Sequence, residues 1–126
     1  GQSAQAAAQP SISQNLTNLT DTPQDVVYTV TPRSGVAGNC IGDTFTVTVT
    51  VNPSPVIPNP SDAICSGDTF TISPANGGST IVPTGTVYTW TVINNPNVTG
   101  ESTQTSAQNN ISQTLTNTSI TPQNVI

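Results

Sequence analysis

The stretch that decides the fold reads TFTVTVTV and runs from Thr44 to Val51. Every second residue is apolar and every residue between is threonine, which is a period of two. A β-strand points successive side chains to opposite faces, and threonine tolerates the extended backbone well. The stretch therefore predicts a strand with Phe45, Val47, Val49 and Val51 on its inward face.

Four shorter segments alternate in the same way, at residues 26–31, 69–73, 87–93 and 111–116. No window combines helical spacing with caps, and 11 Pro and 9 Gly punctuate the segments between the strands. The pattern predicts an all-β chain folded as an antiparallel β-sandwich. Its expected core consists of Tyr28, Val30, Phe45, Val47, Val49, Phe70, Ile72, Tyr88 and Trp90.

The chain also repeats itself. Residues 1–27 align without a gap on residues 100–126, and 15 of the 27 positions are identical. The offset, from Gly1 to Gly100, is 99 residues, which is the size of one small β-domain. Self-similarity at a fixed period indicates a repeat architecture. We therefore expect a tandem repeat with a 99-residue period, of which this chain holds one period and the start of the next.

A proline-rich segment, PSPVIPNP at residues 53–60, follows the strongest strand. Proline cannot donate ladder hydrogen bonds, so this segment is predicted to be a short stiff linker. We expect residues 1–52 to be the C-terminal strands of one sandwich repeat and residues 53–126 the N-terminal strands of the next. Neither part then closes a core alone, and each leaves an unpaired sheet edge that invites strand addition.

The charge balance excludes several classes of function. The chain has one basic residue, Arg33, six acidic residues and no histidine, for a net charge of −5. Nucleic acids and anionic membrane surfaces require a cationic surface, and no apolar run approaches the roughly 20 residues of a spanning helix. Without Lys or His, the usual pairs of nucleophile and general base cannot be assembled. We expect no enzyme activity, no cofactor, no nucleic-acid partner and no membrane insertion.

A shorter echo points to a family. NCIGDTFTV at residues 39–47 matches ICSGDTFTI at residues 64–72, and YTVTP at residues 28–32 echoes YTWTV at residues 88–92. These motifs resemble the Ig-like and PKD-like repeats of very large Bacteroidota surface proteins. The resemblance covers nearly the whole period and implies an exported adhesin or cell-surface filament. The WDFGDG motif typical of true PKD domains is absent, so only the broad sandwich type carries over.

Cys40 and Cys65 are the only cysteines. In an exported chain a disulfide is favoured over a metal site, which would need more ligands. The two positions fall at opposite ends of a sandwich, so each cysteine is predicted to bond a partner in an adjacent unit. Two buried, unpaired thiols are the alternative.

The acidic and aromatic residues favour structural roles. Asp43 and Asp68 occupy matching Gly-Asp-Thr triplets, where a turn in which Asp bonds its own backbone is favoured over a calcium site. Asp21, Asp25, Asp62 and Glu101 are scattered and predicted to be solvated. Trp90 is favoured as a core residue over a sugar-binding platform.

Glycosylation is a separate expectation. Asn-x-Ser/Thr triplets begin at Asn15, Asn18, Asn97, Asn110 and Asn117. The Bacteroidota resemblance adds O-linked candidates at Thr44 and Thr69, each of which lies between Asp and Phe. The polar stretch at residues 94–110 is predicted to be either a sugar-bearing surface or an additional edge strand.

Two functions remain after these exclusions. The first is a structural subunit or repeat of an extracellular bacterial fibre or stalk at the cell surface, whose partners are copies of itself joined head to tail. The alternative is an adhesin module that binds glycans or host and environmental surfaces through its loops. The units are joined by one continuous chain or by strand complementation between separate chains, and we expect the continuous chain.

Overall fold

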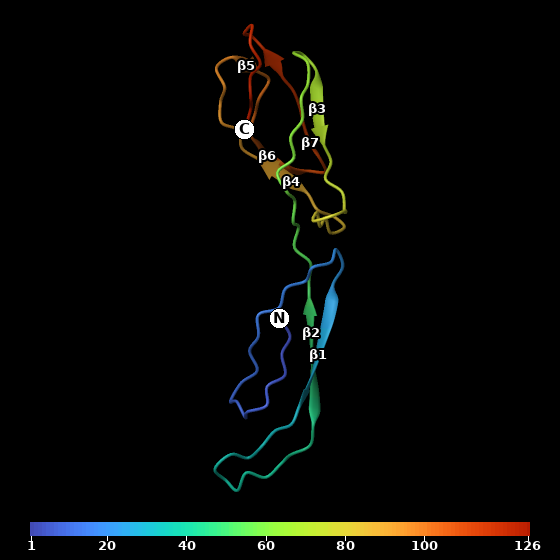
Figure 1. Ribbon diagram of the computed structural model, residues 1–126, viewed down its shortest axis with the longest axis vertical. Helices are drawn as coiled ribbons and strands as arrows, with labels where there is room; N and C mark the ends of the chain where they lie inside the picture. The colour runs from blue at the N-terminus through green and yellow to red at the C-terminus, as the bar shows by residue number, and fades with distance from the viewer. The chain divides into compact units, whose positions relative to one another are not determined.

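The computed structural model describes every residue from Gly1 to Ile126, and its regular structure consists of strands alone (Figure 1). The chain divides into two compact units, Gly1–Ser54 (unit 1) and Pro55–Ile126 (unit 2). All strand pairs are antiparallel. The predicted all-β class is therefore confirmed.

Unit 1 is built around one long hairpin (Figure 1). Its strands β1 (Gln24–Val30) and β2 (Phe45–Val51) pair along their whole length. Residues directly opposite each other in an antiparallel pair point to the same face. The alternation in the sequence therefore places seven apolar side chains on one face, called here the apolar hairpin face: Val26, Tyr28, Val30, Phe45, Val47, Val49 and Val51.

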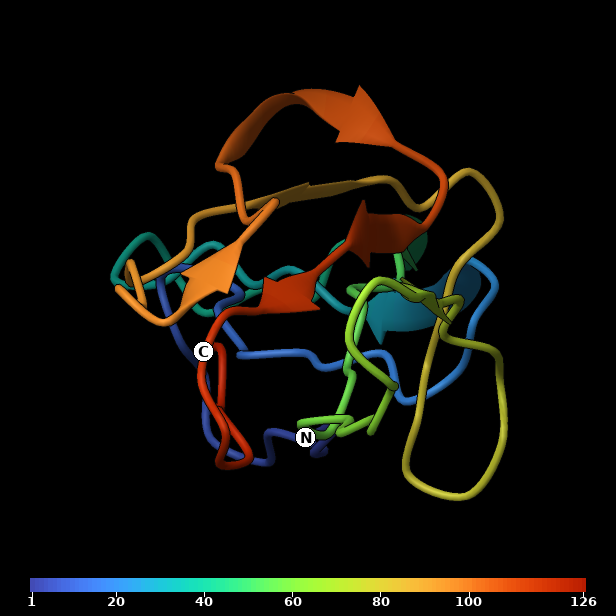
Figure 2. The ribbon, with the colours of Figure 1, turned by 90° about the horizontal axis from the view of Figure 1, so that it is seen from above.

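Unit 2 contains three two-stranded ladders. β3 (Thr69–Ile72) pairs with β7 (Ile111–Thr114), β4 (Tyr88–Trp90) with β6 (Gln104–Gln108), and β5 (Val98–Thr99) with β8 (Thr116–Asn117). β7 and β8 follow each other along the chain, so one segment serves two ladders (Figure 2). β6 lies within the polar stretch at residues 94–110, which does form an additional strand.

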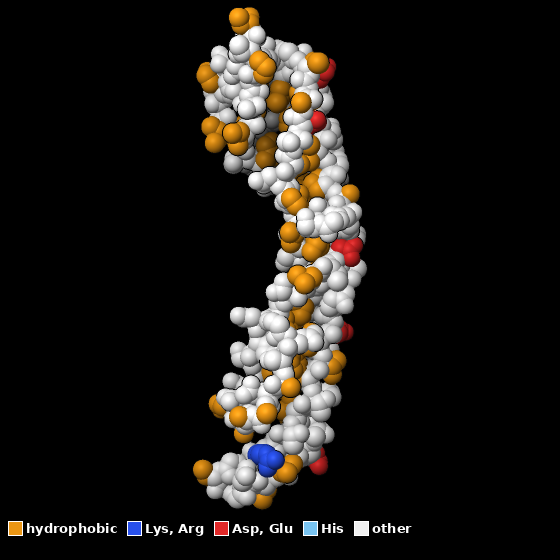
Figure 3. Space-filling model, viewed as in Figure 1, with side chains coloured by type: hydrophobic (Ala, Val, Ile, Leu, Met, Phe, Trp, Pro, Cys, Tyr) orange, Lys and Arg blue, Asp and Glu red, His pale blue; other side chains and the backbone are white.

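Neither unit encloses a hydrophobic core. Val98, with 8% of its surface exposed, is the only buried residue of the chain. Seven of the nine predicted core residues are half-buried, but Phe45 and Val49 are 49% and 39% exposed. For these two residues the prediction is wrong within this chain, because unit 1 has no second sheet to cover the apolar hairpin face. Hydrophobic side chains are accordingly visible on the surface of both units (Figure 3).

Candidate functional site

The first copy of the repeated segment forms a turn held by side chains. Asn18 Oδ1 accepts hydrogen bonds from the N–H and the hydroxyl of Thr20 at 2.9 and 2.8 Å, and Asn18 Nδ2 donates to the carbonyl of Thr22 at 2.7 Å. Gln24 Nε2 then donates to the hydroxyl oxygens of Thr20 and Thr22, both at 3.2 Å. Short polar side chains form such turns because they can satisfy nearby backbone groups.

The second copy forms the same turn 99 residues later. Asn117 Oδ1 accepts from the N–H and the hydroxyl of Ser119 at 2.8 and 2.9 Å, and Asn117 Nδ2 donates to the carbonyl of Thr121 at 2.8 Å. Gln123 Nε2 donates to the hydroxyl oxygens of Ser119 and Thr121, both at 3.1 Å. The distances agree within 0.1 Å with those of unit 1, so the local sequence is sufficient to specify this turn.

A glutamine upstream of the turn is also duplicated. Gln14 Nε2 donates to the carbonyl and the hydroxyl oxygens of Ser3 at 2.6 and 2.9 Å. Gln113 Nε2 makes the same two bonds to Ser102 at 2.5 and 2.8 Å. Sequence reasoning missed these glutamines, and it singled out Asn18 and Asn117 only as glycan attachment sites. Their identity in both copies at the fixed offset was the signal that could have revealed them.

The two copies differ in what surrounds them. Ile111 opens β7, which pairs with β3, and its side chain is half-buried. Its counterpart Ile12 lies outside any strand and is 52% exposed. Unit 1 has the β1–β2 hairpin and no counterpart of β3, β4 or β5, whereas unit 2 has those strands and no hairpin. Each unit therefore lacks the strands that the other one contains.

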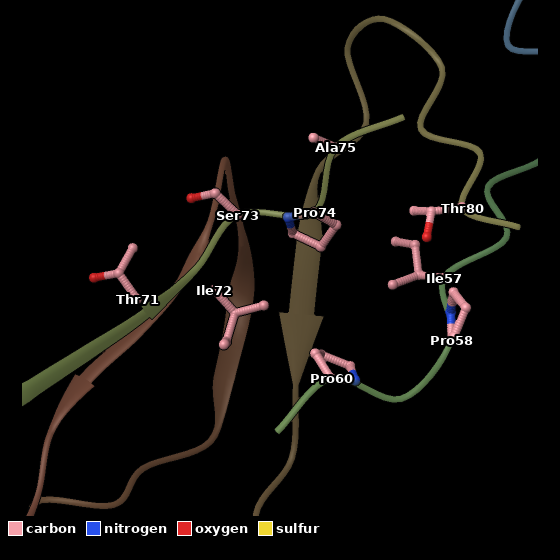
Figure 4. A pocket seen from close by; sticks show the side chains of 9 residues that line it. All are labelled: Ile57, Pro58, Pro60, Thr71, Ile72, Ser73, Pro74, Ala75 and Thr80. Atoms are coloured by element: carbon pink, nitrogen blue, oxygen red, sulfur yellow. The ribbon is translucent and has the colours of Figure 1, made fainter. Parts of the chain in front are cut away.

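An open hollow of about 310 Å³ lies in unit 2. Ile57, Ile72 and Pro74 face this space, whereas Thr71 points away from it (Figure 4). The hollow is lined by Ile57, Pro58, Pro60, Thr71, Ile72, Ser73, Pro74, Ala75 and Thr80. Binding sites usually add a few convergent polar or charged groups, and sugar sites add aromatic platforms. This lining has neither charged nor aromatic residues.

Both cysteines are exposed and carry free thiols. Cys40 lies in the loop between β1 and β2, where its carbonyl accepts from Ser34 N at 3.0 Å. Cys65 precedes Ser66, whose hydroxyl bonds both the N–H and the carbonyl of Asn117 at 3.0 and 3.2 Å. The alternative that the thiols are buried is wrong for this structure.

The acidic residues have distinct surroundings. The turn before β3 is closed by a main-chain bond from Asp68 N to Cys65 O at 3.0 Å, not by the Asp68 side chain. Glu101 corrects the expectation of a solvated carboxylate. It is half-buried, Oε1 accepts from Asn95 N at 2.6 Å, and Oε2 is buried without a partner. No three Cys, Asp or Glu side chains of the chain lie close enough together to hold a metal ion.

Trp90 is half-buried, and its indole N–H donates to the carbonyl of Ser102 at 3.0 Å. A sugar platform needs an open ring face, whereas a tryptophan that packs partly and satisfies its N–H fits a structural role. Trp90 is also the only tryptophan in the chain, which makes it a specific fluorescence reporter for unit 2.

The candidate glycan sites differ in how available their side chains are. Asn18 and Asn117 are half-buried and hold the duplicated turns through their amides. Asn97 Nδ2 reaches Gln123 Oε1 at 3.4 Å, and the Thr69 hydroxyl shares a 2.6 Å bond with that of Thr114. The side chains that remain open to solvent are those of Asn15, Thr44 and Asn110.

Comparison with known families adds one finding. A family model described as PKD-like domain matches the chain twice, over residues 1–55 and over residues 62–126. No curated protein and no solved structure matches the chain significantly. Nothing in the fold provides a helix with the length and apolar character needed to cross a membrane.

Proposed function

Since the chain belongs to the PKD-like domain family, we propose that it is a structural repeat or subunit of an extracellular fibre or stalk at a cell surface. Its partners in this proposal are copies of the same sequence, joined head to tail. The observation that carries the proposal is the turn network at Asn18 and Asn117, which occurs twice in surroundings that complement each other.

Burial supports the same proposal. A PKD-like unit that kept Val98 as its only buried residue would gain little hydrophobic stabilisation, because that gain scales with the apolar area removed from water. Thirteen large apolar side chains are exposed, in both units. Copies that cover these side chains would supply the missing burial. Charged residues make up only 6% of the chain, which limits the repulsion that a net charge of −5 adds between copies.

The alternative, an adhesin module, has less support. The hollow of unit 2 lacks the aromatic and charged groups that recognise sugars, and the open side chains of Asn15 and Asn110 would more simply carry glycans than bind them. Catalysis has no support, because the chain lacks Lys and His and gathers no cluster of acidic groups.

Solution behaviour tests the proposal. Sedimentation velocity and electron microscopy of the full chain should show concentration-dependent association into rods, with an advance of roughly 30–40 Å per unit. A monomer at all concentrations that melts cooperatively and binds a defined sugar on a glycan array would instead establish the adhesin function.

A further inference from the structure

The turn of unit 1 makes one hydrogen bond that its copy in unit 2 lacks. Asn18 Nδ2 donates to Thr22 O and also to Val51 O, at 2.8 Å, across a sequence separation of 33 residues. Asn117 Nδ2 donates to Thr121 O alone, so its second N–H has no acceptor. The missing acceptor is the carbonyl that ends β2.

The duplicated glutamine also lacks one hydrogen-bond partner in unit 2 that it has in unit 1. Gln14 Oε1 accepts a hydrogen bond at 3.0 Å from the hydroxyl of Tyr28, the second residue of the apolar hairpin face. Gln113 Oε1 accepts none, although Gln113 Nε2 is held by Ser102 just as Gln14 Nε2 is held by Ser3. The vacancies at Asn117 and Gln113 thus correspond to two positions of one segment, residues 28–51.

In unit 2, residues 124–126 lie beside residues 93–95, close to the open edge of β4. Ile93 N donates to Ile126 O at 3.1 Å, and Asn95 Nδ2 donates to Asn124 O at 2.9 Å, which sets the two segments antiparallel. Ile126 is the counterpart of Val27, so the residues that follow in the repeat, Tyr28–Val30, would lie beside Val92 to Trp90. β4 is paired on one edge only, with β6, and β1 likewise only with β2.

The side chains on the two edges match in polarity. Tyr28 and Val30 belong to the apolar hairpin face, and Trp90 at the end of β4 and Val92 two residues beyond it are both half-buried. The antiparallel register pairs Tyr28 with Val92 and Val30 with Trp90, so apolar side chains would fall on one common face. A shift by one residue would place them opposite threonine.

We propose that unit 2 carries a docking seat for a second copy of residues 28–51, formed by the open edge of β4 together with Asn117 and Gln113. The hairpin adds to β4 by strand addition, the Val51 carbonyl accepts from Asn117 and the Tyr28 hydroxyl donates to Gln113. This inference rests on the proposed function and deepens it, because it names the residues through which copies join.

The first copy holds the reciprocal seat. Residues 12–15 correspond to β7, whose Ser112 hydroxyl bonds Thr71 Oγ1 at 3.0 Å and Phe70 O at 2.9 Å. Ser13 is the counterpart of Ser112 and is exposed, as is Ile12. A second copy of β3 fits there, and a completed unit then contains residues 55–126 of one copy and residues 28–54 of the next.

The test extends the full chain after Ile126 by a copy of residues 28–54, which contains no tryptophan. In the extended chain Trp90 fluorescence should shift to shorter wavelength, and amide exchange at Thr89 and Thr91 should slow by about tenfold or more. A matched control carries Val47→Asp and Val49→Asp in the appended copy only and should show neither effect. A second control appends a Gly/Ser segment of equal length.

A finer variant replaces Tyr28 by Phe in the appended copy only. It removes the hydroxyl that would donate a hydrogen bond to Gln113 Oε1 and leaves the Tyr28–Gln14 bond of unit 1 intact. The melting temperature of the extended chain should therefore fall while its Trp90 emission stays shifted. Equal exchange and emission in the extended and unextended chains would overturn the docking seat.

The outcome separates this inference from the proposed function. If the unextended chain forms rods but the extension does not protect β4, the fibre function is supported and the docking seat is refuted. If the extension protects β4 but the chain never associates, the docking seat is supported and the fibre function is refuted.

Discussion

Asn117 shows how a single side chain can specify a turn. Its side-chain amide makes three hydrogen bonds, with the N–H and the hydroxyl of Ser119 and with the carbonyl of Thr121. Because Asn117 is half-buried, water cannot easily take over these bonds. The same geometry at Asn18 shows that this property belongs to the sequence and not to the surrounding fold.

Asn117→Ala should therefore lower the free energy of unfolding of unit 2 by about 1.5–4.5 kcal/mol, because it removes three hydrogen bonds worth about 0.5–1.5 kcal/mol each in net terms. Thermal unfolding followed by Trp90 fluorescence measures this. Asn110→Ala, at an exposed position without side-chain hydrogen bonds, is the control and should change stability little. Equal effects of both substitutions would contradict the role of the turn.

Gly100 is required for a different reason. Its φ is +93°, and a Cβ there would overlap the carbonyl oxygen of Thr114. Gly85 has a similar φ of +85° but open space around its Cβ position. Gly85→Ala should cost about 1–2 kcal/mol from the backbone conformation alone, and Gly100→Ala about 2–5 kcal/mol because the clash is added. Chemical denaturation of the two variants compares them, and equal costs would show that β7 moves freely.

At the scale of elements, the main-chain hydrogen bonding of the β1–β2 hairpin is complete, whereas its apolar face is left without a covering sheet. The ladder pairs all seven residues of each strand. The opposite face is polar apart from Val27, and Thr50 Oγ1 there donates to Asp25 Oδ1 at 2.7 Å. Hydrogen bonding thus stabilises the hairpin locally, while burial of its apolar face requires a partner sheet.

Val49→Asp should abolish self-association, because assembly would bury an unpaired charge on the apolar hairpin face. Thr48→Asp places the same charge one residue away on the opposite face and should leave association unchanged. Sedimentation velocity at several concentrations compares the two variants. Association that survives Val49→Asp would show that copies meet through another surface.

At the scale of the whole molecule, Cys40 lies in unit 1 and Cys65 in unit 2. Cys65 lies next to Asn117, the counterpart of Asn18, which bonds Val51 at the base of the hairpin. Cys40 lies in the loop at the other end of that hairpin. In the completed unit proposed above, the two cysteines would therefore lie at opposite ends, and the pairing between adjacent units stays a prediction.

Oxidised polymer should accordingly run as a ladder on non-reducing electrophoresis and collapse to single chains on reduction. Cys40→Ser should remove the ladder as completely as Cys65→Ser, because each bond uses one of each. Two free thiols per chain in the oxidised polymer, or a disulfide within one chain, would refute the pairing.

The sequence by itself determined the local structure. Period-two alternation specified β1, β2 and β3, since strand faces follow directly from alternating polarity, and the repeated segment specified the Asn18 and Asn117 turns through side-chain contacts only two to four residues apart. The predicted strand at residues 87–93 was too long, because only Tyr88–Trp90 finds a partner within the chain.

Only the tertiary structure decided which side chains are covered. Ile12 and Ile111 stand in the same sequence, ISQ, yet one is 52% exposed and the other half-buried, because β3 pairs with the second copy alone. Burial depends on partners far away in the sequence, and a local pattern cannot state whether they are present. For the same reason the pattern predicted Phe45 and Val49 as core residues, whereas the fold of this chain leaves them exposed at an uncovered face.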